Sequence, residues 1–394
     1  MPFALHVLAL AVFAQGTSEF MLSGLLPGIA HDLHVSIPAA GRLTSAFALG
    51  MIIGAPLMAV AAARASRRRS LLAFLVTFLL VHVVGALTTS YAVLLVTRFV
   101  GALANAGFLA VAMAAATSMA APNAKGRATS VLLGGVTLAC VVGVPAGALL
   151  GHLWGWRSAF WAVALASAPA AVAILRAVPA GPAGPGGPGA AGEFRALRSP
   201  RLVVTLLLGA LVNGATFCAF TFLAPVLTTV TGWSSGWIPA LLALFGTGSF
   251  IGVTVGGRLA DTRPLPLLVT GGTALLAGWS AFAVLADSPV AATVFVLVQA
   301  VLSFAVGSTL ISQALYAAPG APTLAGGFAT AAFNVGAAIG PWAGGAAIEA
   351  GFGYRSALWV SALLMALALA LAAMAGVVRR GTAEGRDTST AGAA

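Results

Sequence analysis

The stretch QGTSEFMLSGLLPG (residues 15–28) holds the feature around which the rest of the chain is organised. It lies in an apolar run from Phe3 to about Ala30 that carries a single carboxylate, Glu19. A charged side chain at mid-bilayer costs about 2.5–3.5 kcal/mol on insertion scales, so such residues usually face a protein interior or a water-filled cavity. The sequence therefore predicts a membrane helix that directs an acid toward the inside of the protein.

The composition of the chain is that of a membrane protein with several spans. Of its 394 residues 60% are hydrophobic and only 7% are charged, and the mean hydropathy is +1.04. Soluble domains carry about 25% charged residues. The first apolar run has no basic segment before it and exceeds signal-peptide length, so we expect it to be retained as a span. Cys140 and Cys218 lie in apolar runs without a CxxC motif, which predicts buried thiols.

Apolar runs of about 20 residues predict an all-α protein with twelve transmembrane helices. The predicted spans are 4–29, 42–63, 71–89, 92–119, 128–153, 158–178, 202–230, 237–260, 265–286, 290–317, 324–349 and 356–378. The segment PAGPAGPGGPGAAGEFRALRSP (179–200) is too rich in proline and glycine to be helical, so it predicts a flexible linker. The expected organisation is a six-helix bundle over 1–178, a second over 201–378, and a short disordered tail over 379–394.

Basic residues gather on one side of this arrangement. Opposite that side only Arg42, Arg157 and Arg355 are expected, and Arg98 lies inside a span. The side shared by the termini and the linker carries Arg64, Arg67, Arg68, Arg69, Lys125, Arg127, Arg176, Arg195, Arg198, Arg201, Arg258, Arg263, Arg379, Arg380 and Arg386. By the positive-inside rule both termini and the linker are cytoplasmic, in a bacterial inner or plasma membrane.

The two halves repeat at a constant spacing of 198 residues. Pro27 pairs with Pro225 at this spacing, and GWRSAFW (155–161) recurs as GYRSALW (353–359). Phe47, Gly50 and Gly54 pair in the same way with Phe245, Gly248 and Gly252. Parallel repeats of this kind place a substrate site near the midplane between the halves and allow alternating access by rocking of one half against the other.

Gln15 and Asn213 are equivalent under this repeat and lie at the same depth in the first and seventh spans. Either both carboxamides face one central cavity, or each bonds to a neighbouring helix, an interaction worth about 0.6 kcal/mol in membranes. We expect the first arrangement. Asn105 and Asn334 are further candidates for polar groups in the cavity, and Phe20, Phe217, Phe220 and Phe222 are candidate apolar walls.

Several motifs resemble the major facilitator superfamily, and within it the twelve-helix drug:proton antiporters. TSEFMLSGLLPGIAHDL (17–33) is similar to the first-span signature of the sugar-efflux and chloramphenicol-resistance exporters. GVPAGALLGHLWGWRSAF (143–160) resembles the antiporter motif of the fifth span, and GGRLADTR (256–263) resembles the loop motif that latches the halves. The whole chain, including NAGFLAVAMA (105–114), is most similar to bacterial chloramphenicol-resistance exporters.

The antiporter motif is physically a ridge of small residues. Gly135, Ala139, Gly143, Gly147 and Gly151 recur every four residues and allow close approach of another helix, while Pro145 can kink the span. Gly340, Pro341 and Gly344 form a shorter ridge in the eleventh span. The resemblance implies that the fifth span packs between the halves and prevents leak.

The loop motif is complete only in the second half of the chain. There Gly257, Arg258 and Asp261 match the family's latch, whereas Ala59 and Ala63 replace its glycine and aspartate in the first half. The resemblance therefore implies a single latch at Asp261 and an outward-facing state that is less firmly held.

Arg98 matches an arginine in the family's fourth-span motif. It either extends to the lipid headgroups or is buried against the first span, and we expect the buried arrangement, in which it influences Glu19. His82 is expected to be a packed neutral ring.

These residues favour a proton-coupled exporter. Desolvation disfavours the charged form of a carboxyl group and a neighbouring cation favours it, so Glu19 with Arg98 nearby suits a proton carrier. No P-loop, metal-ligand cluster or set of catalytic acids and bases occurs, which predicts no enzyme, cofactor or metal site. The expected partners are the bilayer, protons and a small drug, with the chain a monomer. The alternatives are an exporter of sugars, nucleosides or other metabolites and a non-transporting sensor or scaffold.

Overall fold

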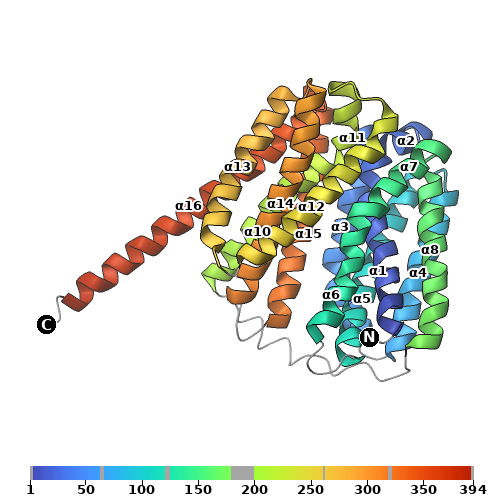
Figure 1. Cartoon of the computed structure of the whole chain (residues 1–394), viewed down its shortest axis with the longest axis horizontal. Helices are drawn as coiled ribbons and strands as arrows, with labels where there is room; N and C mark the ends of the chain where they lie inside the picture. The colour runs from blue at the N-terminus through green and yellow to red at the C-terminus, as the bar shows by residue number, and fades with distance from the viewer. Residues whose placement is uncertain are drawn as a thin grey trace.

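The computed structural model describes residues 3–62, 66–119, 125–178, 199–260, 262–317 and 322–391. These residues form an all-helical protein, as the apolar runs predict. The linker expected over 179–200 falls, but for its last two residues, outside the described residues, and so does Asp261. Figure 1 shows the helices as two bundles side by side, with α2, α7 and α11 meeting at one end and the N-terminus at the other.

The first half contains the six expected spans, two of which are divided by short turns. Its elements are α1 (Phe3–Phe20), the 3₁₀ turn η1 (Met21–Gly24), α2 (Leu26–Asp32), α3 (Ile37–Ala62), α4 (Arg67–Leu87), α5 (Tyr91–Met119), α6 (Lys125–Leu138), the π-helical turn η2 (Ala139–Gly143), α7 (Val144–Trp154) and α8 (Arg157–Ala177).

The second half follows the same order. Its elements are α10 (Pro200–Thr221), α11 (Leu223–Pro225), the π-helical turn η4 (Val226–Val230), the 3₁₀ turn η5 (Ser235–Trp237), α12 (Ile238–Ala260), α13 (Pro264–Leu285), α14 (Pro289–Ala317), α15 (Pro322–Ala347), the π-helical turn η6 (Ile348–Phe352) and α16 (Ser356–Ala391).

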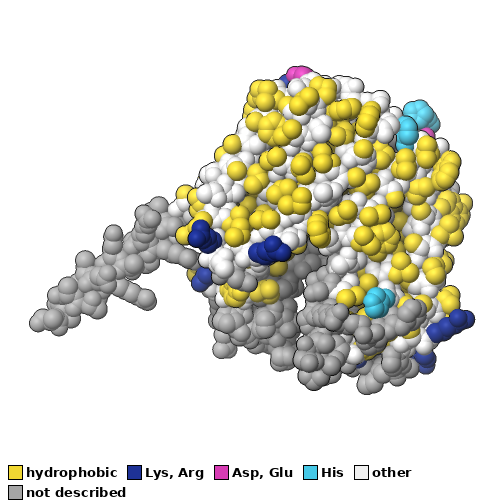
Figure 2. All heavy atoms as spheres, viewed as in Figure 1, with side chains coloured by type: hydrophobic (Ala, Val, Ile, Leu, Met, Phe, Trp, Pro, Cys, Tyr) yellow, Lys and Arg dark blue, Asp and Glu magenta, His cyan; other side chains and the backbone are white. Residues whose placement is uncertain are grey.

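Length and composition mark 11 helical stretches of the described residues as membrane spans. The remaining expected span, 324–349, corresponds to α15, which has 26 residues. This helix is rich in glycine, which allows it to lie close to α10: a Cβ on Gly336 would fall 2.1 Å from the Ala210 carbonyl oxygen. Apolar side chains cover much of the face shown in Figure 2.

The C-terminal segment differs from the sequence-based expectation. Disorder was expected over 379–394, but α16 continues to Ala391. No proline occurs after Pro341 to end the helix, so its backbone hydrogen bonds continue beyond the apolar part.

The fifth span bends where its sequence contains a proline. Pro145 has no N–H, so the carbonyl of Val141 four residues earlier loses its α-helical partner. The helix widens at this place into the π-helical turn η2, and α7 begins directly after it. This turn places Cys140 against the other half: a Cβ on Gly246 of α12 would lie 2.3 Å from the Cys140 carbonyl oxygen.

The two halves also meet through α3 and α15. The Ser45 hydroxyl donates to the Ala338 carbonyl at 2.7 Å, and Arg42 forms an ion pair with Glu349 at 2.5 Å. Both side chains of the ion pair are partly exposed, at 49% and 41%. The arginines of the repeated segment bind aspartates within their own halves, Arg157 with Asp32 and Arg355 with Asp287. Hydrogen bonds from His31, Arg157 and Trp156 lower the pKa of Asp32 against a smaller opposing effect of burial.

Candidate functional site

Glu19 lies in the last turn of α1, next to the bend at η1. Its half-buried side chain is in hydrogen-bonding contact with Asn105 of α5 and interacts electrostatically with Arg98 on the same helix. Asn105 is itself buried. Cys140 of η2 lies close enough to interact with the same carboxylate. Two elements, α5 and η2, therefore converge on Glu19 of α1, at the level where the first and the fifth spans both bend.

Arg98 is only 2% exposed and is fixed to α1 by two hydrogen bonds. One nitrogen donates to the Ser18 hydroxyl at 2.7 Å and another to the Ser18 carbonyl at 2.9 Å. The guanidinium also lies over the Phe47 ring, 4.4 Å from its centroid, in a cation–π contact. Arg98 thus occupies the buried position that we expected, and it does not extend to the headgroups. Among the ion pairs within the described ranges, none joins Arg98 to Glu19.

His82 of α4 completes this arrangement. Its Nδ1 lies 2.7 Å from the Phe78 carbonyl, which can only accept, so Nδ1 carries the proton of the neutral ring. Its Nε2 then accepts from the Ser18 hydroxyl at 2.6 Å. The bonds run from Arg98 to Ser18, from Ser18 to His82 and from His82 to Phe78. His82 is packed and buried, and it also orients the serine that holds Arg98.

Replacing His82 with leucine is expected to reduce export several-fold. The Ser18 hydroxyl would lose its acceptor in a buried place, and an unsatisfied buried group costs about 1–3 kcal/mol. Arg98 would then be less firmly held beside Glu19. The measurement is the initial export rate at equal protein level, with His6→Leu, which removes an exposed histidine of α1, as the control. Wild-type export by the His82 variant would show that the ring does not position Arg98.

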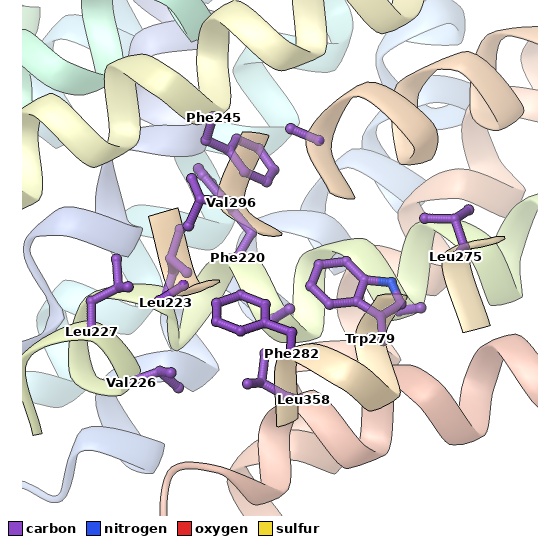
Figure 3. Close-up of a cluster of buried hydrophobic side chains, with 14 of the residues drawn as sticks. Phe220, Leu223, Val226, Leu227, Phe245, Leu275, Trp279, Phe282, Val296 and Leu358 are labelled. Atoms are coloured by element: carbon purple, nitrogen blue, oxygen red, sulfur yellow. The ribbon is translucent and has the colours of Figure 1, made fainter. Parts of the chain in front are cut away.

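An aromatic cavity lies beside Glu19, where the two halves meet. It is lined by Phe20, Cys140, Val144, Thr216, Phe217, Phe220, Leu242, Phe245 and Phe304. Phe20, Phe217 and Phe220 are candidate walls from the sequence, and the structure brings them together. The rings are in mutual contact: Phe20 and Phe217 have centroids 5.8 Å apart, and Phe220 stacks on Phe245 at 4.6 Å. Figure 3 shows Phe220 and Phe245 side by side at the edge of the core of the second half.

This cavity is closed to a drug-sized molecule in the present conformation. Its volume is about 20 Å³, close to that of one water molecule. The rings must separate, by rotation of side chains or by movement of the halves, before a larger apolar molecule can enter. The lining is apolar and aromatic, as in many sites for small molecules, but the space between the rings holds none larger than water in this conformation.

The other predicted polar residues lie in different surroundings. Neither amide atom of the buried Gln15 has a hydrogen-bond partner among the described residues. Its repeat equivalent Asn213 instead donates to the Phe333 carbonyl at 2.7 Å, which joins α10 to α15. Asn334 donates to Thr330 within its own helix at 3.0 Å. The pair Gln15 and Asn213 is therefore not equivalent in its contacts, and Asn213 has the interhelical role.

The glycine ridges pack within the halves, in contrast to the inter-half packing that was expected of them. A Cβ on Gly143 would meet the Thr17 side chain, one on Gly147 would meet Met21, and one on Gly151 would meet Leu25. The ridge thus positions α1, η1 and the residues that follow it. In α15, Gly340 lies against the Gly214 backbone and Gly344 against Cys218. Pro341 lies inside the same helix. The fifth span still meets the other half, through Cys140 of η2, which lies against Gly246, and through Val144 and Ala148 of α7, which share a core cluster with Leu242 of α12.

The predicted latch can be followed only in part, because Asp261 lies outside the described residues. Gly257 and Arg258 are both exposed at the end of α12, and a Cβ on Gly257 would meet no atom within 4 Å. Phe222, another candidate wall, is fully buried and packs against Gly41 and Gly344. It therefore does not line the aromatic cavity.

Several residues of the site were missed from the sequence. Phe245 and Phe304 line the cavity, and Phe47 and Ser18 hold Arg98. The internal repeat could have identified two of these residues, because Phe47 and Phe245 are equivalent in it. Phe47 lies against Arg98, and Phe245 lies against Phe220. Serine in a helix carries no comparable signal.

A bent first helix with an inward-facing acid, in a fold of two six-helix bundles, is what we expect of a membrane transporter. Residues 8–325 match the Major Facilitator Superfamily, and the chain belongs to that family. It is 55% identical over 375 residues to the chloramphenicol resistance protein of Streptomyces lividans, covering 94% of this chain and 96% of that protein. It is 35% identical over 372 residues to the inner membrane transport protein YdhP of Escherichia coli K12, covering 94% and 95%.

Solved structures share the fold. A bacterial homologue of the human lysosomal transporter Spinster, in an inward-facing, occupied conformation, has a TM-score of 0.77 at 20% identity and covers 95% of this chain and 96% of its own. A single-residue mutant of the nucleoside transporter NupG has a TM-score of 0.78 at 12% identity, with coverage of 94% and 99%. At these identities the likeness concerns the fold alone.

Proposed function

We propose that this chain exports small, largely apolar drugs in exchange for protons, with chloramphenicol as the first candidate substrate. The observation that carries the proposal is the aromatic cavity next to Glu19, in a chain 55% identical to a chloramphenicol resistance protein. The cavity is lined by five phenylalanines, which suit an apolar aromatic molecule.

Glu19 carries the exchanged proton in this proposal. Phe20, the next residue in the chain, lines the cavity, so a change of charge at Glu19 is felt at the binding site. Drug and proton then compete: the drug leaves when the proton arrives. Asn105 is in hydrogen-bonding contact with the carboxyl group, and the cation of Arg98 lies close enough to attract the carboxylate once the proton has left.

Gln15 supplies a polar anchor for the substrate. It lies one helical turn before Glu19, and its unpartnered amide can both donate and accept. A substrate with hydroxyl, amide or nitro groups would satisfy it when the cavity opens. The rest of the recognition is apolar, which is typical of sites for small molecules.

The orientation follows from the distribution of charge. Basic residues gather on the side of the linker and the termini, which we place in the cytoplasm of a bacterial inner or plasma membrane. Exchange of a neutral drug for one proton moves positive charge inward, so the membrane potential contributes about 2.3 kcal/mol per 100 mV. Nothing in the proposed mechanism requires more than one chain, and we expect a monomer.

The test is export of labelled chloramphenicol from cells that express the chain, energised and then treated with a protonophore. Export that stops on uncoupling would support both the drug and the driving force. If labelled chloramphenicol left these cells no faster than cells without the protein, the drug assignment would be contradicted. The metabolite-exporter alternative would then replace it.

The Arg42–Glu349 pair holds the halves together on the side opposite the termini, and alternating access requires it to open. An exposed ion pair stabilises the conformation that contains it by about 0–1 kcal/mol, which changes the equilibrium constant between two conformations by a factor of at most about five. Arg42→Glu alone would place two acids opposite each other, so we expect it to favour the conformation open on that side and to slow export severalfold. Arg42→Glu with Glu349→Arg should recover most of the rate. Equal rates in the single and double variants would show that the pair does not contribute.

A further inference from the structure

A second cavity, remote from Glu19, lies in the second half between α10, α13, α14 and α16. Its volume is about 430 Å³, within the usual range for small-molecule sites. We call it the α13–α16 groove. Most of its described lining is apolar, with Leu208 and Leu268 among the larger side chains and Met365 and Leu369 from α16. No residue of the aromatic cavity lines it.

The groove extends over one leaflet of a bilayer. Its lining on α10 runs from Arg201 to Val212 and on α16 from Met365 to Ala375. At 1.5 Å per residue these stretches are about 16 and 15 Å long, which is half of a hydrocarbon core of about 30 Å. The lining begins on the side of the termini, where α10 and α13 start and toward which α14 and α16 run.

The groove reaches the outer surface of the molecule. Leu265 and Val269 of α13 line it and are 69% and 53% exposed, so the wall that they form faces the acyl chains of the membrane. In Figure 1, α13 and α16 are the outer helices on this side of the second half. A lipid can therefore enter sideways, without passing through the centre of the protein.

The mouth of the groove is positively charged. Arg201 is the one charged side chain among the described residues that line it, and no acid is among them. Arg263, which is exposed, directly precedes the lining residue Pro264. Figure 2 shows basic side chains at the lower edge of this half. A cation at the headgroup level, next to an apolar groove one leaflet deep, is complementary to a molecule with an anionic headgroup and an acyl chain.

We propose that the α13–α16 groove binds an anionic phospholipid from the leaflet on the side of the termini. Its phosphate lies at Arg201 and one acyl chain fills the groove toward Val212. A neutral drug would match the apolar depth but would gain nothing from the arginine. The bound lipid joins α16 to α10 and α13 where the protein itself leaves a space between them.

The test is native mass spectrometry of the full chain in detergent, titrated with phosphatidylglycerol or with phosphatidylcholine of the same acyl chains. We expect phosphatidylglycerol to bind more tightly, and Arg201→Gln to weaken that binding about fivefold, the effect of one cation at a membrane surface. Arg69→Gln is the control, because it removes an exposed arginine from the same side of the first half. An unchanged lipid preference in the Arg201 variant would overturn the proposal.

A matched pair of alanines on α16 tests the acyl-chain position. Ala372 and Ala373 are both exposed, but only Ala372 lines the groove. Ala372→Trp should lower phosphatidylglycerol binding, because the indole occupies the groove, and Ala373→Trp should leave it unchanged. Equal effects of the two substitutions would overturn the proposal. The proposal would also be overturned if the protein bound the two lipids equally well and if it bound chloramphenicol in a way that Ala372→Trp abolished.

Discussion

Glu19→Gln is expected to abolish export driven by a pH gradient while the protein remains folded and still binds the drug. The amide keeps the shape of the side chain and its contact with Asn105, but it cannot take up and release a proton. The exchange then has no coupling ion, so the export component that depends on the gradient should fall to the background of empty vesicles. Drug binding, which depends chiefly on the aromatic cavity, should change by no more than a few-fold.

The measurement is drug flux in proteoliposomes after a pH jump, with binding followed separately by isothermal titration. Asp287→Asn is the matched control, because it neutralises an exposed carboxylate whose ion pair with Arg355 lies at a helix end. The control should export at nearly the wild-type rate. Full pH-driven flux through the Glu19 variant would show that the proton is carried elsewhere.

Gly135→Ala is expected to destabilise the first half and to remove most export activity. A Cβ at this position would lie 2.5 Å from the Ala9 carbonyl oxygen and 3.1 Å from the Phe13 nitrogen. These are backbone atoms of α1, so the whole helix that carries Gln15 and Glu19 must move to accept one methyl group. Overpacking of this kind costs about 1–3 kcal/mol.

The adjacent residue provides the control. Gly134 is exposed, and a Cβ there would meet nothing within 4 Å. Alanine is favoured over glycine in a helix by about 1 kcal/mol, so Gly134→Ala should be neutral or stabilising. The measurements are the thermal unfolding temperature in detergent and the rate of drug export. Both should fall in the Gly135 variant. In the Gly134 variant both should stay unchanged or the unfolding temperature should rise. Equal behaviour of the two would mean that α1 does not depend on this close approach.

The spans and the family could be predicted from the sequence because they depend on local properties. An apolar run of about 20 residues is long enough to cross a membrane as a helix that satisfies all of its own backbone hydrogen bonds, and each expected span from 4–29 to 356–378 has a helix at its place. The burial of Arg98 and the grouping of Phe20, Phe217 and Phe220 also agree with what the sequence led us to expect.

The missed contacts depend on the rotation of each helix about its axis. The spacing of Gly143, Gly147 and Gly151 shows that one face is lined by small residues, but not which part of the chain meets that face. In the structure it is the first span of the same half, from α1 through η1 to Leu25. The repeat predicted equal roles for Gln15 and Asn213, yet the two halves are not identical, and only Asn213 reaches a carbonyl. A contact such as Ser18 to His82 joins residues 64 apart in the chain, and no local pattern encodes it.

The direction of the hydrogen bonds around Arg98 has a consequence for proton movement. Every donor in the series points the same way, from the guanidinium through Ser18 and His82 to the Phe78 carbonyl, and a peptide carbonyl cannot pass a proton onward. This series of hydrogen bonds therefore does not conduct protons. It holds the positive charge of Arg98 beside Glu19, and it provides no route for a proton through α4. In the mechanism proposed above, the proton of Glu19 would therefore not leave through this series of bonds. The side of the carboxylate toward Asn105 and the aromatic cavity is then the side on which we expect proton and drug to compete.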